Sequence, residues 1–278
     1  MTFLSIIYSQ NKGYYIVVNL VIYCIVAVCS YGAYRLNALS KSGALAAVLL
    51  GISIVIGFGW KGLLLIGIFF SSSSILSSYK KRMKQAVDKK LANGSRRNWA
   101  QVAANGGPAG LYSLLYFISD DSQIWLVAFI VSIAAATSDT WSSEVGVLSK
   151  SNPIHLIGLK RCERGTSGAV SLLGSIAGIA GSLCIAVTAV ILFSLSLSTL
   201  LLISAFGFLG SIVDTLLGAF LQVEYSCPIC SSHTERRIHC NKPTVKRKGV
   251  NWINNEVVNL SSVVISSMLC IIIWHTIT

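Results

Sequence analysis

Long apolar runs, separated by short polar segments, recur from one end of the chain to the other. Several runs are close to 20 residues, the length at which an α-helix crosses a hydrocarbon core of about 30 Å. They predict about eight membrane-spanning helices, at roughly 14–34, 42–58, 61–79, 100–118, 123–141, 167–193, 198–221 and 255–275. The expected fold is therefore all-α, a polytopic membrane helical bundle.

Helix-breaking residues occur at two places in these predicted spans. The second and third are separated only by "GFGWKG", and the fourth contains "NGGPAG". Pro and Gly inside a membrane helix often mark a kink, which is tolerated where protein or a cavity satisfies the freed backbone groups. The first apolar run is too long for the core of a secretory signal and lacks a basic segment before it, so we expect no cleaved signal peptide.

Composition agrees with a membrane protein. Hydrophobic residues make up 54% of the 278 residues and charged residues only 12%, whereas soluble domains carry about 25% charged residues. We expect residues 1–278 to form a single integral membrane domain, with a basic loop at 80–99 and a Cys/His loop at 223–250.

The basic residues predict the orientation. Of the 22 Lys and Arg residues, all but Lys12 and Lys61 lie in odd-numbered connections between the predicted spans. The positive-inside rule then places these connections in the cytoplasm and both termini outside. The net charge of +12 follows from this topology. Nucleic acid is not an expected partner, because the charges are spread over loops that the helix count already explains.

Carboxylates and amides gather at the cytoplasmic ends of the predicted spans. An Asp inside a membrane segment costs about 2.5–3.5 kcal/mol on insertion scales and usually faces the bundle interior. We expect Asp139 and Asp214 to be functional, with a polar contact between helices as the alternative. Glu144 follows Asp139 by five residues, a rotation of about 140° on a continuous helix, so the two would not share a face. Gln101, Asn105, Asn255 and Asn259 lie at the corresponding ends of two other spans.

Residues Gly165, Thr166, Ser167 and Gly168 form a turn that we place at the start of the sixth span. Free N–H groups and the helix dipole make a helix N-terminus an anion site. Three cations precede this turn: Lys160, Arg161 and Arg164. Small residues also pack membrane helices together, and Gly174 and Gly178 have the spacing for that role.

Together these residues indicate metal-assisted phosphate chemistry. Mg²⁺ is usually held by one or two carboxylates and the substrate phosphates. We expect Asp139 and Asp214 to hold Mg²⁺, with Glu144 as a further catalytic candidate. Lys160, Arg161, Arg164 and the turn would bind phosphate; Asn105, Asn255 and Asn259 would orient the phosphates or the metal's waters, or else only join helices. The Walker P-loop pattern and the protein-kinase signature set are both absent from the sequence.

The segment "CPICSSHTERRIHC" suggests a second metal site. Three cysteines and a histidine suffice for a tetrahedral zinc site. We expect Cys227, Cys230 and Cys240 as ligands, with His233 as the fourth, because His239 is adjacent to Cys240. A redox-labile or unliganded loop is the alternative. Cys24, Cys29, Cys184 and Cys270 lie in predicted spans, where a cysteine acts as a small apolar residue.

The motifs "SDTWSSEVGVLSK", "RGTSGAVSLLGSIAG", "GSIVDTLLGAFLQ" and "NNEVVN", with "QVAANGG" before them, resemble those of a membrane family called domain of unknown function 92. That family includes the animal transmembrane protein 19 and the plant phytyl-phosphate kinase. The resemblance runs from about Gln101 to Asn259. The family's turns usually read Gly-Asp-Thr-Trp and Gly-Thr-Ser-Gly-Gly; here Ser138 and Ala169 replace one glycine in each.

The resemblance implies a membrane kinase that converts an isoprenyl or polyprenyl monophosphate to its diphosphate. The implied co-substrate is a nucleoside triphosphate, CTP or another, and the implied partners are a lipid substrate and the membrane. Two alternatives stay open: a CTP-using lipid transferase, and a transporter of a cation or a phosphorylated solute.

Overall fold

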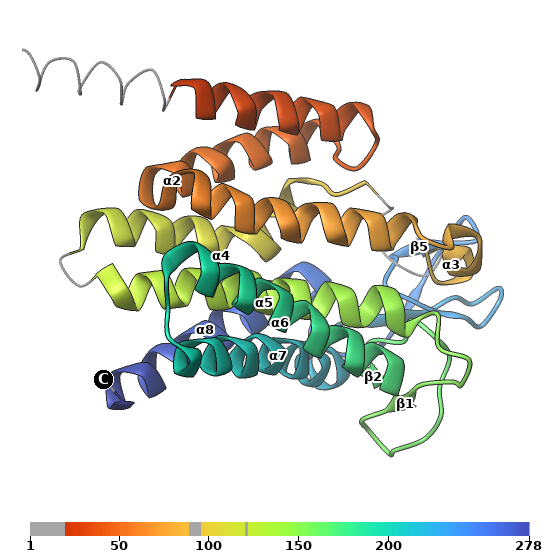
Figure 1. Ribbon diagram of the computed structural model, residues 1–278. Helices are drawn as coiled ribbons and strands as arrows, with labels where there is room; N and C mark the ends of the chain where they lie inside the picture. Colours follow the sequence, from red (N-terminus) through yellow and green to blue (C-terminus); the bar gives the residue numbers. More distant parts are fainter. Residues whose placement is uncertain (1–19, 89–95, 120–121, 278) are drawn as a thin grey trace, which may run out of the picture.

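The protein is described by a computed structural model that covers residues 20–88, 96–119 and 122–277. It is a bundle of long α-helices with short β-strands at one end (Figure 1). The helices are Leu20–Arg35, α2 (Lys41–Ser78), α3 (Lys81–Asp88), α4 (Trp99–Ile118), α5 (Ser122–Gly146), α6 (Leu172–Phe193), α7 (Leu197–Phe220) and α8 (Asn255–Ile277).

The second and third predicted spans form one helix with a break. In α2 the helical dihedral angles are interrupted at Gly59, where φ is 57° and ψ is −144°. Glycine adopts this positive φ without steric cost because it has no Cβ. The chain reverses there, and the two arms of α2 lie side by side (Figure 1). The "GFGWKG" sequence thus forms a tight reversal and not a loop.

Among the described residues, five helices are long and apolar enough to cross a membrane: α2, α5, α6, α7 and α8. The predicted count of eight is not reached by length and composition alone. α2 counts once although it has two arms, α4 is less apolar because of residues such as Gln101 and Asn105, and the helix Leu20–Arg35 is short. The prediction of a polytopic α-helical membrane bundle is confirmed.

Helix α5 occupies the centre of the bundle. It packs against α2, α4, α6, α7 and α8, and every residue from Val127 to Ser138 is buried. Small residues allow the close approach: a Cβ on Gly210 of α7 would lie 2.5 Å from the Cβ of Ala135, and one on Gly174 of α6 would lie 2.8 Å from the Ser142 carbonyl oxygen. The glycines of α6 therefore pack helices together, as the alternative reading held. Asp139 follows directly after this buried stretch.

The connections at one end of the bundle carry short strands that the apolar periodicity could not predict. β1 (Ile154–His155) pairs with β2 (Ala169–Val170). A three-stranded sheet has the order β4 (His233–Thr234), β3 (Glu224–Ser226), β7 (Val245–Lys248), and β5 (Ile238–His239) pairs with β6 (Lys242–Pro243). The three-stranded sheet lies within the Cys/His loop, which connects α7 to α8.

The odd-numbered connections meet at this end, which we call the basic end: 36–40, 79–98, 147–171 and 221–254, apart from 89–95 outside the described residues. The first and third connections bind each other, since the Ser40 N–H donates to the Arg97 carbonyl (3.0 Å) and the Arg97 N–H to the Ala38 carbonyl (3.0 Å). The end of α8 lies at the opposite end of the bundle (Figure 1), where the Lys61 ammonium lies 5.4 Å from the Phe193 ring centre.

Candidate functional site

A polar cavity of about 520 Å³ opens at the basic end, among the ends of α2 to α8. It gathers most of the residues that the sequence singled out: Asn105, Asp139, Glu144, Arg164, Gly165, Thr166, Ser167, Gly168, Asp214, Asn255 and Asn259. Lys160 and Arg161 are exposed near the β1–β2 ribbon and do not line it. The expected phosphate-binding role of these two residues is therefore not matched by their position.

Asp139 of α5 and Asp214 of α7 line the cavity together, close enough for their charges to interact. Asp139 has no hydrogen-bond or ion-pair partner within the described part of the chain, so no contact of that kind ties it to another helix. Asp214 accepts from the Ser262 hydroxyl at 3.3 Å. When the Asn259 side-chain amide is oriented so that both its nitrogen and its oxygen have suitable partners, its nitrogen also donates to Asp214 at 3.0 Å. Two carboxylates with unused oxygen atoms are suitable ligands for a hard cation such as Mg²⁺.

Glu144 is engaged elsewhere in the cavity wall. Helix α5 continues unbroken to Gly146, so Glu144 points away from Asp139, as the helical rotation predicts. It forms an ion pair with Lys84 at 2.5 Å and accepts a hydrogen bond from the Ser77 hydroxyl. The Lys84 side chain is only 5% exposed, and it also donates to the Leu76 carbonyl at 2.7 Å. These contacts fix α3 against α5 and α2. The catalytic role expected for Glu144 thus gains no support from its position.

Two cations of the cavity were missed by the sequence analysis. Lys84 and Arg97 both line it, although the basic loop had been read only as a topology signal. The Arg97 guanidinium donates to the Ser74 hydroxyl at 3.1 Å and lies 5.2 Å from the Phe70 ring centre. Burial lowers the pKa of Arg97, and Glu144 partly offsets this; the guanidinium stays protonated. Arg164 lines the cavity as well and donates to the Lys150 carbonyl at 3.2 Å.

The turn Gly165–Gly168 is not at a helix N-terminus, which corrects the expectation. Helix α6 begins at Leu172, capped by the Ser171 hydroxyl, which accepts from the Gly174 N–H at 3.1 Å. The turn instead leads into β2. The turn can still bind an anion, because the backbone N–H groups of Gly165, Ser167 and Gly168 have no partner among the described residues. Successive free N–H groups in a turn make a concave anion site without a helix dipole.

The turn packs directly on the end of α7. Gly168 has a φ of 81°, and a Cβ at this position would overlap the Cα and Cβ of Ala219. The next residue, Ala169, begins β2 and needs no such freedom, so alanine in place of the usual glycine is accommodated. The Ser167 hydroxyl donates to the Gln222 side-chain oxygen at 2.8 Å, which fixes the turn against the segment after α7.

The amides at the starts of α4 and α8 lie beside the carboxylates. Asn105 lies one turn beyond Gln101, and Asn259 one turn beyond Asn255; all four line the cavity or its rim. In the other orientation of its amide, Asn259 donates instead to the Asn105 side-chain oxygen at 3.4 Å and joins α8 to α4. Both expected roles of the asparagines, joining helices and facing a ligand, are compatible with these positions.

A cluster of ligand-type side chains lies in the Cys/His loop, outside the cavity. The sulfur atoms of Cys227, Cys230 and Cys240 and a ring nitrogen of His239 all lie within 4.8 Å of one another. His233, expected as the fourth member, is not among them. Hydrogen bonds with Ser232 lower the pKa of Cys230 to about 6, and the hydrogen bond between Cys240 and Cys230 raises that of Cys240 to about 11.

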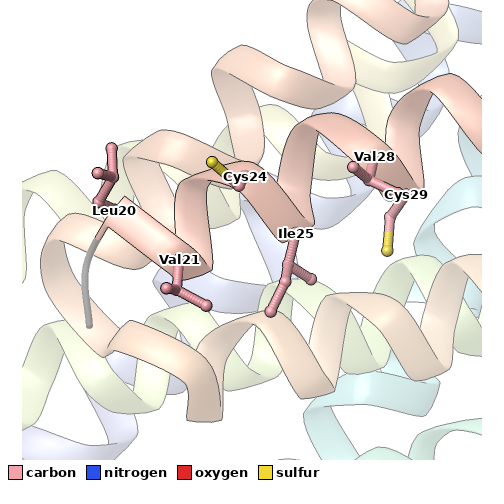
Figure 2. Close-up of a pocket in the computed structure, with 6 residues that line it drawn as sticks. All are labelled: Leu20, Val21, Cys24, Ile25, Val28 and Cys29. Atoms are coloured by element: carbon pink, nitrogen blue, oxygen red, sulfur yellow. The ribbon is translucent and has the colours of Figure 1, made fainter. Parts of the chain in front are cut away.

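A different hollow lies on the helix Leu20–Arg35 (Figure 2). It is lined by Leu20, Val21, Cys24, Ile25, Val28 and Cys29. Its lining offers only hydrocarbon and two thiols, so it matches a surface in contact with lipid chains and carries no site for polar chemistry.

The fold is that of an integral, multi-pass membrane protein with a polar cavity at one end of its helical bundle. The family described as "Integral membrane protein DUF92" matches residues 24–267, and the chain belongs to this family. The resemblance seen in the motifs is thereby confirmed.

Relatives from several kingdoms cover most of the chain. It is 32% identical to Protein PGR of Arabidopsis thaliana, over 86% of this chain and 90% of that protein. It is 28% identical to the uncharacterized membrane protein MJ0933 of Methanocaldococcus jannaschii, over 93% and 94%. Protein VTE6, chloroplastic, of Arabidopsis thaliana is 25% identical, over 85% and 65%. No solved structure matches the chain significantly.

Proposed function

We propose that the protein is a membrane kinase that phosphorylates an isoprenyl or polyprenyl monophosphate to its diphosphate. The observation that carries this proposal is the polar cavity. It combines the carboxylates of Asp139 and Asp214 with the turn; among residues 20–88, 96–119 and 122–277, neither the Asp139 carboxylate nor three N–H groups of the turn have a hydrogen-bond partner. The resemblance to the family of the plant phytyl-phosphate kinase supplies the substrate class.

In the reaction, a phosphate oxygen of the lipid monophosphate forms a bond to the γ-phosphorus of the nucleoside triphosphate. The bond from that phosphorus to the bridging oxygen breaks, and the nucleoside diphosphate leaves. Catalysis of such a transfer is mainly positioning and neutralisation of charge. Mg²⁺, held by Asp139 and Asp214, would neutralise phosphate charge when bound.

The remaining contacts to the phosphates come from the chain's own cations, N–H groups and amides. The N–H groups of Gly165, Ser167 and Gly168 bind phosphate oxygens, and Arg164 lies beside them. Lys84 and Arg97 add positive charge on the wall formed by α3 and the start of α4. Asn255 and Asn259 orient phosphate oxygens or water from the start of α8. The Lys160 and Arg161 side chains, exposed outside the cavity, have no part in this arrangement.

An apolar stripe on α7 offers a route for the lipid tail. Phe208, Ile212 and Leu216, spaced four residues apart, share one face of the helix and line the cavity. Ile212 and Leu216 are also partly exposed. An isoprenyl chain lying along this stripe would remain among hydrocarbon side chains while its phosphate reaches the polar cavity.

The orientation follows the positive-inside rule. We propose that the helix Leu20–Arg35, the two arms of α2, and α4 cross the membrane together with α5 to α8, which makes eight segments. The basic end would then face the cytoplasm, where nucleoside triphosphates are available, and both termini would lie outside. The proposal includes the expectation that the whole chain is one membrane domain.

The two other functions make different demands on the cavity. A transporter typically places its polar site near the middle of the bilayer, between repeated halves with broken helices. Here the carboxylates and amides gather at one end of the bundle, which favours an enzyme. A CTP-using lipid transferase could use the same cavity, but it would release pyrophosphate and not a nucleoside diphosphate.

The decisive experiment uses purified full-length protein, Mg²⁺, isoprenyl monophosphates of several chain lengths, and nucleoside triphosphates labelled on the γ-phosphorus or in the base. Label from the γ-phosphorus in an isoprenyl diphosphate supports the kinase. Base label in the lipid product would instead establish the transferase. If neither product forms with any of the four common nucleotides, while the protein is folded and contains Mg²⁺, the proposal is wrong.

A further inference from the structure

We infer that Cys227, Cys230, His239 and Cys240 form a zinc site, and that this site braces the wall of the polar cavity. The distances between the ligand atoms fit one tetrahedral ion. The Cys240 and Cys230 sulfur atoms are 3.8 Å apart, and the His239 Nδ1 atom lies 3.3 Å from the Cys240 sulfur and 3.5 Å from the Cys230 sulfur. Zinc bonds of about 2.3 Å to sulfur and 2.0–2.1 Å to nitrogen imply ligand atoms roughly 3.5–3.8 Å apart in a tetrahedron.

The local backbone brings the four ligands to one point. In the first half of the site, the Ser231 N–H donates to the Cys227 carbonyl at 2.9 Å, which closes a turn around Cys230. In the second half, Cys240 and Asn241 connect β5 to β6 with φ values of 51° and 56°. Two positive φ values are the signature of a tight type I′ hairpin turn. Cys240 therefore does not alternate sides with His239 as it would in an extended strand, and both can face the same ion.

Strained backbone at Cys240 points in the same direction. A left-handed conformation at a residue other than glycine costs of the order of 1–3 kcal/mol and persists where the surroundings impose it. The β5–β6 hairpin turn imposes it here, and a bound metal would add a second constraint. Sulfur atoms 3.8 Å apart are not joined by a disulfide, whose bond is about 2.05 Å, and all three cysteines of the site are free.

The choice of zinc follows from the ligand types. Three thiolates with one imidazole in a tetrahedral arrangement are a common structural zinc set. Because all four positions are filled by protein, the ion has no open position for substrate, and its role is to hold the loop. This inference rests on the Cys/His loop alone and holds whether or not the proposed kinase activity is found.

A line of hydrogen bonds connects this loop to the phosphate turn. Glu235, between the two halves of the metal site, lines the polar cavity and accepts from the Gln222 side-chain amide at 2.8 Å. Gln222 in turn accepts from the Ser167 hydroxyl at 2.8 Å. The metal thus fixes Glu235, and through Gln222 it positions the turn Gly165–Gly168. Glu235 and Gln222 are positioning residues in this account.

The first test measures metal in full-length protein purified in detergent without chelators. We expect about one zinc per chain, and at least a tenfold lower content in Cys230→Ser and in His239→Ala. His233→Ala is the matched control for the histidine and Cys184→Ser for the cysteine, and both should keep their zinc. Zinc-free wild-type protein, or loss of zinc in His233→Ala but not in His239→Ala, would overturn the site.

Cobalt substitution in the wild-type protein tests the site without any variant, and so remains informative if a variant fails to fold. Wild-type protein stripped of metal and loaded with Co²⁺ should show thiolate-to-cobalt charge-transfer absorption and the visible bands of a tetrahedral ion. Absence of these bands in folded protein that has bound Co²⁺ would exclude the tetrahedral thiolate site. A disulfide found by mass spectrometry between any two of the three cysteines would do the same.

The second test addresses the link to the cavity by hydrogen exchange in the peptide that covers 154–170. The Leu156 N–H donates to the Gly168 carbonyl at 3.1 Å and the Ala169 N–H to the Thr166 carbonyl at 3.2 Å, so both report on the turn. Removing zinc should speed their exchange at least tenfold in the wild type. In Gln222→Ala, which keeps its zinc, exchange should be fast with or without the metal. Unchanged exchange in the wild type after zinc removal would refute the link.

Discussion

The polar cavity and the Cys/His cluster are assembled in opposite ways. The cavity draws its side chains from α2 through α8, so its residues come together only when the whole bundle is packed. The cluster takes all four ligands from residues 227–240, where two local turns suffice. The cavity can therefore be damaged from many positions in the chain, whereas the cluster depends on a few backbone angles and, as inferred, on a single ion.

The largest expected effect separates chemistry from packing within the cavity. Asp139→Asn and Asp214→Asn should each lower kinase turnover at least 100-fold, about 2.7 kcal/mol, because each removes a carboxylate from the proposed Mg²⁺ site. Turnover is measured with γ-labelled nucleotide in protein that elutes as a single folded species. Glu163→Gln, an acid-to-amide change outside the cavity lining, is the control. Near-normal turnover in either Asp variant would remove that residue from the metal site.

The next effect concerns the ion pair in the cavity wall. Lys84→Met leaves the Glu144 carboxylate without its cation, and breaking a buried pair in this way costs about 3–5 kcal/mol. Glu144 is 24% exposed, so we expect a smaller loss of unfolding free energy, about 2–3 kcal/mol. Chemical unfolding in detergent measures it. The double variant Lys84→Met/Glu144→Gln should recover part of the loss; a double variant no better than Lys84→Met would mean that the pair does not hold α3.

A smaller effect probes the contact between the turn and α7. Gly168→Ala places a Cβ against Ala219 at a positive φ, and should cost about 2 kcal/mol of stability from overpacking and backbone strain. Gly67→Ala is the matched control, because nothing lies within 4 Å of a Cβ there and alanine favours a helix. Thermal unfolding compares the two. Equal midpoints would show that the turn is free to move away from α7.

The smallest effect measures the connection between the two regions. Gln222→Ala removes one hydrogen bond on each side, to Ser167 and to Glu235, and should cost about 1 kcal/mol. A double-mutant cycle with Ser167→Ala isolates the hydrogen bond between Gln222 and Ser167, for which we expect a coupling of about 0.5–1 kcal/mol. Additive losses would mean that the cavity and the loop are energetically independent. Gln123→Ala, at an exposed glutamine near the start of α5 and the opposite end of the bundle, is the reference for a neutral change.

Much of the membrane bundle could be predicted because bilayer physics leaves few alternatives. Apolar runs of the right length form helices, and the charges lie at one end, as the structure confirms for the odd-numbered connections. Asp139 and Asp214 were found for the same reason: a carboxylate in a membrane segment is expensive unless it faces the interior. Their meeting in one cavity follows from the direction of the helices.

The errors arose where local backbone conformation decides the outcome. The sequence of the turn Gly165–Gly168 favours the start of a helix. The chain instead first forms β2, paired with β1, and a strand of two residues leaves no periodic apolar pattern in the sequence. The sequence favours His233 as a zinc ligand because neighbours in an extended strand point apart. The positive φ of Cys240 instead allows His239 to lie with the three sulfur atoms. Lys84 and Arg97 resemble the other basic residues of their loop, so nothing in the sequence marks them as part of the cavity.

The reversal at Gly59 constrains how the chain enters the membrane during synthesis. If both arms of α2 cross the bilayer, as proposed, no loop separates them, and we expect the pair to insert as a hairpin. Lys61, next to the reversal, would then pass through the hydrocarbon with it, against a cost of about 2.5–3.5 kcal/mol at the bilayer centre. Once across, its ammonium lies 5.4 Å from the Phe193 ring centre, an attraction of about 0.5–2 kcal/mol that opposes the return of the hairpin.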